Sequence, residues 1–102
     1  MAAIVLLVTL HLFDPSSLKE KRGVVRPLVE RLRRRLSVSV AEVGLQDELR
    51  RAQIGLALVA SDLTAARRLL DDAQRAIDDE LIGRGEVLDA VVEELTVDSE
   101  LR

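Results

Sequence analysis

The longest apolar run of the chain, residues 2–13, restricts the fold more than any other feature. A helix that crosses a bilayer takes about twenty residues, so this run is too short to span one. No basic region precedes it and no small-x-small cleavage site follows it, which argues against a signal peptide. Odd- and even-numbered positions of residues 4–13 are both rich in Val, Leu and Ile, as in a central strand covered on both faces. We therefore predict a soluble cytoplasmic protein built around this strand, without membrane association.

Residues 17–36 are predicted to form an amphipathic helix after the first strand. Ser17 and Glu20 have the spacing of a capping box, which satisfies two amides at a helix start. Pro27 lies inside the helix and removes one amide donor, so we expect a kink or a loosened turn near Gly23. The predicted apolar stripe consists of Leu18, Val25, Leu28, Val29, Leu32 and Leu36.

The second half of the chain has the same alternation of strand and helix signals. Residues 37–43 and 52–60 read as strands, and the short polar loop between them predicts an antiparallel hairpin. Ser61-Asp62 caps a second helix, and Gly83-Arg84-Gly85 ends it. Residues 86–95 fit a helix or a strand, and we choose the strand because it completes a four-stranded sheet. The second helix is predicted to face inward at Leu63, Ala66, Leu70, Ala73, Ile77 and Leu81.

The predicted order is β-α-β-β-α-β, which is two split βαβ units in one domain. It places this α+β chain in the ferredoxin-like class, with two helices on one face of a four-stranded antiparallel sheet. We expect the domain to cover residues 1–95, followed by a polar tail over residues 96–102.

Positive charge is concentrated in the first helix. Residues 17–36 hold eight basic and two acidic side chains, although the whole chain has a net charge of −3. Guanidinium groups one or two helical turns apart can contact successive phosphates, which predicts binding of RNA or the ribosome. Alternatively, they pair with the acidic second helix, through Asp71, Asp72, Asp78, Asp79 and Glu80. The candidate nucleic-acid-binding residues are Lys19, Lys21, Arg22, Arg26, Arg33 and Arg34.

The face of the first strand turned away from the helices is the second candidate surface. An exposed aliphatic patch usually marks an interface, which predicts a homodimer or larger oligomer through the sheet. A loop or the C-terminal tail folded over this face is the alternative. Stacking of RNA bases there is disfavoured, because Phe13 is the sole aromatic residue. The candidate interface residues are Val5, Leu7, Thr9, His11 and Phe13.

No recognisable catalytic or metal-binding pattern is present, so we expect no enzymatic activity, no cofactor and no metal. The chain has no cysteine, and His11 is its single histidine, which makes a poor metal site and suits a structural role. Gln46 and Asp47 in the hairpin loop form a functional pair or shape the turn, and we favour the turn.

Several segments resemble the YlxP-like proteins, a family of small bacterial proteins. They are SLKEKR at 17–22 with the Val-Val-Arg that follows, VSVAEV at 38–43, Gln46-Asp47, and a G-x-A-x-V-x-S-D run at 55–62. The resemblance covers residues 4–62 and weakens toward residue 95, and Gly23 and Pro27 depart from the usual pattern. It implies a ferredoxin-like fold, no established catalytic activity, and a link to translation, because members are often encoded beside an initiation factor and a ribosome-maturation factor.

Together these features predict a non-catalytic protein that binds RNA or the ribosome through its first helix. The competing hypothesis is a homo-oligomeric interaction module, or a small-ligand regulatory module, that uses the open face of the sheet.

Overall fold

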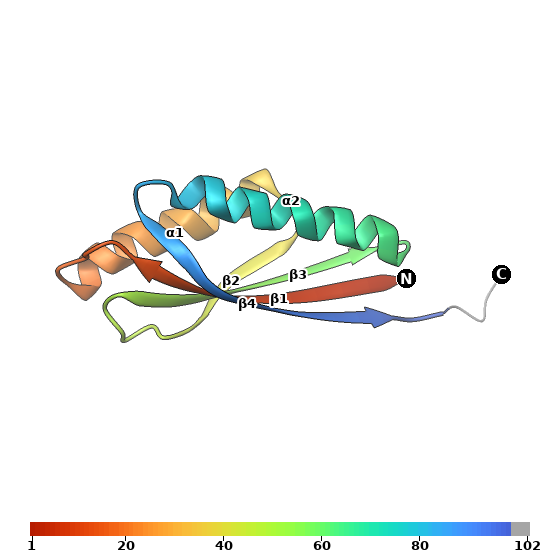
Figure 1. The fold of residues 1–102 in the computed structure, drawn as a ribbon, viewed down its shortest axis with the longest axis horizontal. Helices are drawn as coiled ribbons and strands as arrows, with labels where there is room; N and C mark the ends of the chain where they lie inside the picture. The colour runs from red at the N-terminus through yellow and green to blue at the C-terminus, as the bar shows by residue number, and fades with distance from the viewer. Residues whose placement is uncertain (99–102) are drawn as a thin grey trace.

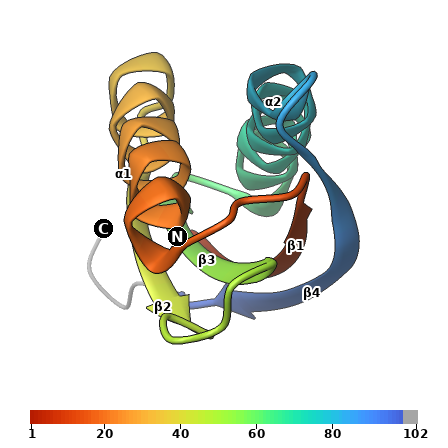
Figure 2. The same cartoon turned by 90° about the vertical axis from the view of Figure 1, so that its left-hand side faces the viewer.

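The computed structural model describes residues 1–98 as one four-stranded sheet with two helices. The strands follow the order β2-β3-β1-β4, and each adjacent pair is antiparallel. Both helices lie on one face of the sheet (Figures 1 and 2). This arrangement confirms the predicted ferredoxin-like fold. In chain order the elements are β1 (Ala2–Leu12), α1 (Leu18–Arg35), β2 (Ser39–Gly44), β3 (Arg51–Ala60), α2 (Leu63–Leu81) and β4 (Gly85–Thr96).

Strand β1 supplies the centre of the core, because it lies between β3 and β4. Its even-numbered side chains face the helices and are fully buried: Ala2, Ile4, Leu6, Val8, Leu10 and Leu12. The odd-numbered side chains face the other side of the sheet, which no helix covers. The expectation of a strand covered on both faces is therefore met on one face only. The strand also begins two residues earlier than predicted and ends at Leu12, so Phe13 lies beyond it.

Helix α1 begins where the capping residues predict. The Ser17 hydroxyl accepts a hydrogen bond from the Glu20 amide at 3.1 Å, while the Glu20 carboxylate accepts from the Ser16 amide at 3.1 Å. The helix continues without interruption to Arg35, so Pro27 does not divide it. Val25, Leu28, Val29 and Leu32 are buried as expected, whereas Leu18 and Leu36 at the two ends are half-buried.

Helix α2 and β4 complete the second half of the fold. Asp62 caps α2 by accepting from the Ala65 amide at 2.8 Å, and Gly83 turns the chain with a positive φ of 76°. Residues 85–96 form the strand that was chosen over a helix. Among the predicted inward positions of α2, Leu63 and Leu70 are half-buried, and the other four are buried.

Strand β4 extends farther than the predicted domain boundary at residue 95. It reaches Thr96, and Val97 then exchanges two backbone hydrogen bonds with Met1, at 2.8 and 2.9 Å. Residues 99–102 of the predicted tail lie outside the described part of the chain. Neither helix of the described residues has the length and apolarity needed to cross a membrane.

Candidate nucleic-acid interface

Three cations form a row along one exposed side of α1, and two of them, Arg22 and Arg26, lie beside Glu42 of β2. Lys19, Arg22 and Arg26 are exposed and fall within an arc of about 60° on a regular helix. Within residues 1–98, none of them lies within 4 Å of a carboxylate. Arg34 is likewise exposed and unpaired there, but it lies farther around the helix. We call the first three residues the cationic row.

Arg33 lies on the same side of α1 as the cationic row, but its guanidinium is paired within the protein. Its Nη1 donates to Glu30 at 2.6 Å, and its Nε donates to the carbonyl oxygen of Val40 at 2.9 Å. The guanidinium therefore ties the end of α1 to β2, and much of its charge is compensated locally. Arg33 is therefore expected to contribute less to the binding of an external anion than the sequence predicts.

On the opposite side of α1, arginines pair with acidic residues of α2. This confirms part of the alternative prediction. Arg31 contacts Glu80 at 2.6 Å, and Arg35 contacts Asp79 at 2.7 Å. The hydrogen bond to Asp79 raises the pKa of Arg35. Intramolecular pairing therefore accounts for the arginines that face α2, and not for the cationic row. Asp71 and Asp78 make no ion pair within residues 1–98, and Asp72 pairs with Arg75 of its own helix at 4.0 Å.

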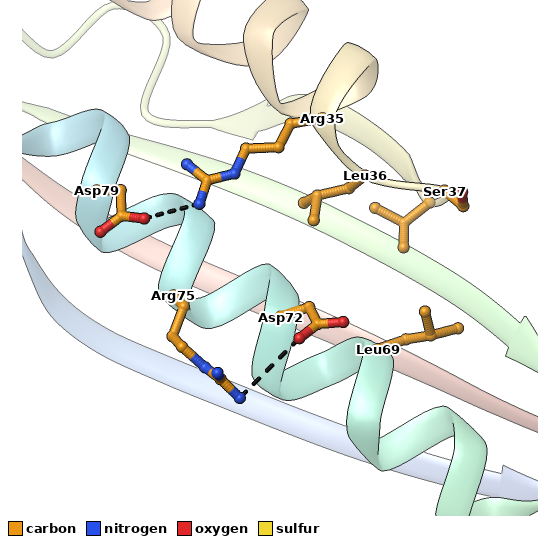
Figure 3. Close-up of a pocket in the computed structure, with 8 residues that line it drawn as sticks. Arg35, Leu36, Ser37, Leu69, Asp72, Arg75 and Asp79 are labelled. Atoms are coloured by element: carbon orange, nitrogen blue, oxygen red, sulfur yellow. Dashed lines mark hydrogen bonds and ion pairs between the residues drawn. The ribbon is translucent and has the colours of Figure 1, made fainter.

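A cavity of about 400 Å³ lies between the C-terminal end of α1 and α2. Figure 3 shows that Arg35 reaches Asp79 across it, while Arg75 lies beside Asp72 on α2. Each guanidinium has its own carboxylate, so the cavity offers little net charge to a ligand. We therefore do not treat it as the principal site.

Lys21 differs from the other predicted nucleic-acid-binding residues because it is buried, with 2% of its surface exposed. Its ammonium donates hydrogen bonds to the carbonyl oxygens of Leu45 and Glu48 in the β2–β3 loop. A buried charge is tolerated when such hydrogen bonds replace water. Lys21 is therefore not part of the exposed cationic surface.

The β2–β3 loop turns back toward α1 at residues 45–48. The Glu48 amide donates to the Leu45 carbonyl at 3.0 Å, which places Gln46 and Asp47 at the centre of a turn. The two residues therefore lie at a turn, as predicted, but within the described residues the Asp47 side chain makes no hydrogen bond to the backbone that would shape it. Leu45 has a positive φ of 57°, a conformation that costs energy for a side chain other than glycine. The two side chains at the turn are exposed.

A pocket of about 200 Å³ lies between α1 and this turn. A larger hollow of about 370 Å³ is lined by Arg26, Glu30, Arg33 and Glu42 together with Val25 and Val29. The two share the lining residues Arg26 and Glu42, and we call them together the α1–β2 groove (its two elements are seen end-on in Figure 2). The smaller pocket is lined by Lys21, Arg22, Arg26, Glu42, Gln46 and Asp47.

Glu42 is the groove residue that sequence reasoning missed. It pairs in register with the buried Ile54, so it lies on the helix-covered face of the sheet, where Val40 is also buried. A carboxylate on this inward face stays partly in contact with solvent, as Glu42 does. No lysine or arginine of residues 1–98 lies within 4 Å of it. The signal was present in the alternation of VSVAEV, where Glu42 occupies an inward position.

The uncovered face of the sheet carries exposed aliphatic side chains on all four strands, among polar ones such as Thr9, Gln53 and Glu93. Val5 is 55% exposed and Val59 is 64% exposed, although both belong to β-strands of the core sheet. Leu7 is half-buried, and its in-register partner on β4 is the exposed Val91. The other exposed aliphatic residues of this face are Ala41 and Val43 on β2, Ala57 on β3 and Leu95 on β4.

Three predicted residues of this face make local contacts. Thr9 accepts a hydrogen bond from Gln53 at 3.2 Å. His11 lies 3.3 Å from Glu86 on β4, and its ring meets that of Phe13 edge-on at 5.8 Å. These contacts hold one end of β1 against its neighbours. Within residues 1–98, no three His, Asp or Glu side chains gather as metal ligands would.

A family model described as "Protein of unknown function (DUF503)" matches residues 4–92. This chain belongs to that family. One DUF503-like relative is the "Uncharacterized protein YlxP" of Bacillus subtilis (strain 168), which is 34% identical over 67 residues. The matched region covers 66% of this chain and 73% of the relative. The resemblance to the YlxP-like proteins is thereby confirmed, and three of its segments meet in the α1–β2 groove: residues 17–22, residues 38–43 and Gln46-Asp47.

Solved structures share the fold at low sequence identity. The structural-genomics protein YJCS has a TM-score of 0.56 at 12% identity, covering 94% of this chain and 99% of that protein. SnoaB from Streptomyces nogalater, a cofactor-independent oxygenase, has a TM-score of 0.53 at 12% identity, covering 99% and 98%. A designed protein with a ferredoxin fold, LFR1 1, has a TM-score of 0.52 at 13% identity, covering 100% and 89%. Identities this low establish the fold alone.

Proposed function

We propose that this protein is a non-catalytic binding protein that contacts RNA phosphates through the cationic row of α1. The observation that carries the proposal is that Lys19, Arg22 and Arg26 are exposed together and unpaired within residues 1–98. Cations with no internal partner are available to an external anion. The family resemblance points to translation, so ribosomal RNA is the proposed target.

The position of the row favours contact with the phosphate backbone over recognition of base sequence. Guanidinium groups along a helix can bind successive phosphates, often through two hydrogen bonds each. Base-specific recognition of single strands relies on aromatic stacking and on groups placed against base edges. The one aromatic residue, Phe13, lies beyond the end of β1 and far along the chain from the groove residues on β2. Binding should therefore be strongly salt-dependent and weakly sequence-dependent.

The test is a salt titration of binding to a single-stranded RNA, measured by fluorescence anisotropy. For single strands, log K falls with log salt by about 0.7 per phosphate contact. The triple variant Lys19→Gln/Arg22→Gln/Arg26→Gln should lower that slope by about 2 and should reduce co-sedimentation with ribosomes.

The matched control removes three exposed cations elsewhere, in Arg50→Gln/Arg68→Gln/Arg75→Gln. It has the same net charge as the test variant, so a long-range charge effect would weaken both equally. A loss of binding in the test variant alone would support the proposed contact between the cationic row and RNA phosphates. Equal slopes in the wild type and the row variant would contradict the proposal.

We also propose a second function, self-association of two copies through the uncovered sheet face. The observation that favours it is the exposure of Val5, Val59, Val91 and Leu95 on one continuous face. Exposed patches of this kind commonly mark interfaces. Two copies related by a twofold axis would cover the same patch on each other.

Val5→Lys tests this second function with little risk to the monomer. Position 5 lies opposite Glu93 on β4, so a lysine there gains a nearby carboxylate in the monomer and adds charge to the interface. Sedimentation equilibrium should show a dimer for the wild type and a monomer for the variant. Ile82→Lys, at a 76% exposed site between α2 and β4, is the control and should stay dimeric. A monomeric wild type at high concentration would remove this proposal and leave the RNA proposal untouched.

A further inference from the structure

We propose that the smaller pocket of the α1–β2 groove binds one ribonucleotide, with its phosphate against the guanidinium groups and its ribose hydroxyls against the carboxylates. The inference deepens the RNA-binding function and rests on it when the nucleotide belongs to RNA. A free ribonucleotide would present the same chemistry, and the experiment below separates the two sources.

The pocket holds opposite charges that do not neutralise each other. Arg22 and Arg26 of α1 form one wall, and Glu42 of β2 with Asp47 of the turn forms the other. No guanidinium of the pocket lies within 4 Å of a carboxylate in the described chain, although the same helix pairs Arg31 and Arg35 fully on its other side. The walls are therefore available to a ligand that carries an anion at one end and hydrogen-bond donors at the other.

The anion at this site is best satisfied by phosphate. Arg22 and Arg26 are one turn apart, and a guanidinium binds phosphate oxygens through paired hydrogen bonds. The buried ammonium of Lys21 lies on the same lining, where its field adds to theirs. Two of its three donors are already used by the carbonyl oxygens of the loop.

The donors at the other end are best supplied by ribose. Ionised Glu42 and Asp47 only accept hydrogen bonds, so they require donors such as hydroxyl groups. A carboxylate that binds the ribose 2′-hydroxyl is a known device in nucleotide-binding folds. The pocket contains no aromatic side chain on which a base could stack, so the sugar rather than the base is recognised. A pocket of about 200 Å³ has room for one sugar-phosphate unit and not for a longer segment.

The structure also keeps the two walls at a fixed separation. Glu42 is part of β2, and the turn that carries Asp47 is held to α1 by the hydrogen bonds from Lys21. A site held in place by such contacts loses less entropy on binding than a mobile one. This predicts selection of RNA over DNA, because only the ribonucleotide carries the 2′-hydroxyl.

The experiment is a titration of the isotope-labelled full chain by NMR, with three probes: uridine 5′-monophosphate, its 2′-deoxy counterpart, and inorganic phosphate. The uridine nucleotide should shift the amides of residues 21–26 and 42–47. It should bind about tenfold more tightly than the deoxynucleotide, because it makes one more hydrogen bond to a charged group. Phosphate should shift residues 21–26 alone.

Two double variants assign the walls. Glu42→Val/Asp47→Ala should bring the ratio of the two nucleotide affinities close to one while binding of the deoxynucleotide persists, and Val suits a half-buried strand position. Arg22→Gln/Arg26→Gln should weaken both nucleotides and phosphate alike. Asp71→Ala/Asp78→Ala makes the same charge change on α2 and should leave the ratio unchanged.

The outcomes separate the two proposals. Equal affinities of the wild type for the two nucleotides, or shifts outside the groove, would overturn the ribonucleotide site. If the ribonucleotide site is overturned but an RNA oligomer still binds in a salt-dependent way, the proposed RNA function is retained. Binding of the nucleotide in the groove without binding of any RNA oligomer supports the site and removes the RNA function. Absence of both kinds of binding overturns both.

Discussion

The carbonyl oxygen of Leu45 accepts a hydrogen bond from the buried ammonium of Lys21, 24 residues earlier in the chain. The same oxygen also accepts from the Glu48 amide, which closes the turn that carries Gln46 and Asp47. Leu45 has a left-handed backbone conformation, and these two bonds stabilise it. One lysine of the first helix thus positions the loop that forms a wall of the α1–β2 groove.

Lys21→Met should therefore destabilise the protein. The methionine replaces the aliphatic part of the lysine but leaves two carbonyl oxygens without a charged donor, and each such bond contributes about 1.5–3 kcal/mol. Since water can reach part of the loop, we expect a loss of about 2 kcal/mol in urea unfolding. Lys19→Met, on the same helix but exposed, should change stability by less than about 0.5 kcal/mol. Equal effects of the two substitutions would contradict this role of Lys21.

Gly23→Ala should stabilise the protein. Gly23 is exposed within α1, and a Cβ there would meet no atom within 4 Å. Alanine in a helix interior is favoured over glycine by about 1 kcal/mol. The melting temperature should rise by about 4–8 °C, measured by circular dichroism. An unchanged or lower melting temperature would show that the turn before Pro27 does not have ordinary helical geometry.

Gly85→Ala should have the opposite effect. A Cβ at Gly85 would lie 2.4 Å from the backbone carbonyl oxygen of His11, at the first pair of the β1–β4 ladder. The backbone must move to relieve that overlap, at a cost of about 1–3 kcal/mol. The same measurement as for Gly23→Ala provides the comparison. Retention of full stability in Gly85→Ala would show that β4 can shift at this end without loss.

Acid should destabilise the protein partly through two carboxylates. Hydrogen bonds from Arg67 and Arg51 lower the pKa of Glu94 and of Glu48, respectively. A lowered pKa in the folded state contributes stability that is complete above the ordinary value of about 4.3 and is lost as the pH falls through the folded value. Urea unfolding between pH 7 and pH 3 should show this loss. Glu94→Gln should lower stability at pH 7 and make the decline below about pH 4.3 shallower, whereas Asp71→Asn should retain the wild-type profile.

The course of the backbone was largely predictable from local patterns. The Ser17 and Ser61-Asp62 cap signals and the stop signal from Gly83 to Gly85 each act over a few residues, and the helices begin and end beside them in the structure. The pattern of residues 86–95 fits either a helix or a strand, and in the structure pairing with β1 makes this segment a strand. The end of β4 was misplaced by one residue because the pairing of Val97 with Met1 joins opposite ends of the chain.

The amino-acid sequence by itself determined the order of elements, the inward positions of the strands and the accumulation of positive charge on the first helix. Only the tertiary structure decided which of those charges remain available. Arg31 meets Glu80 49 positions later, Lys21 is buried under a loop, and Arg22 and Arg26 line a groove that also holds Glu42. Helical periodicity fixes the direction in which a side chain leaves the helix axis. Whether the charge of that side chain is neutralised depends on which residue of a distant element comes within a few ångströms.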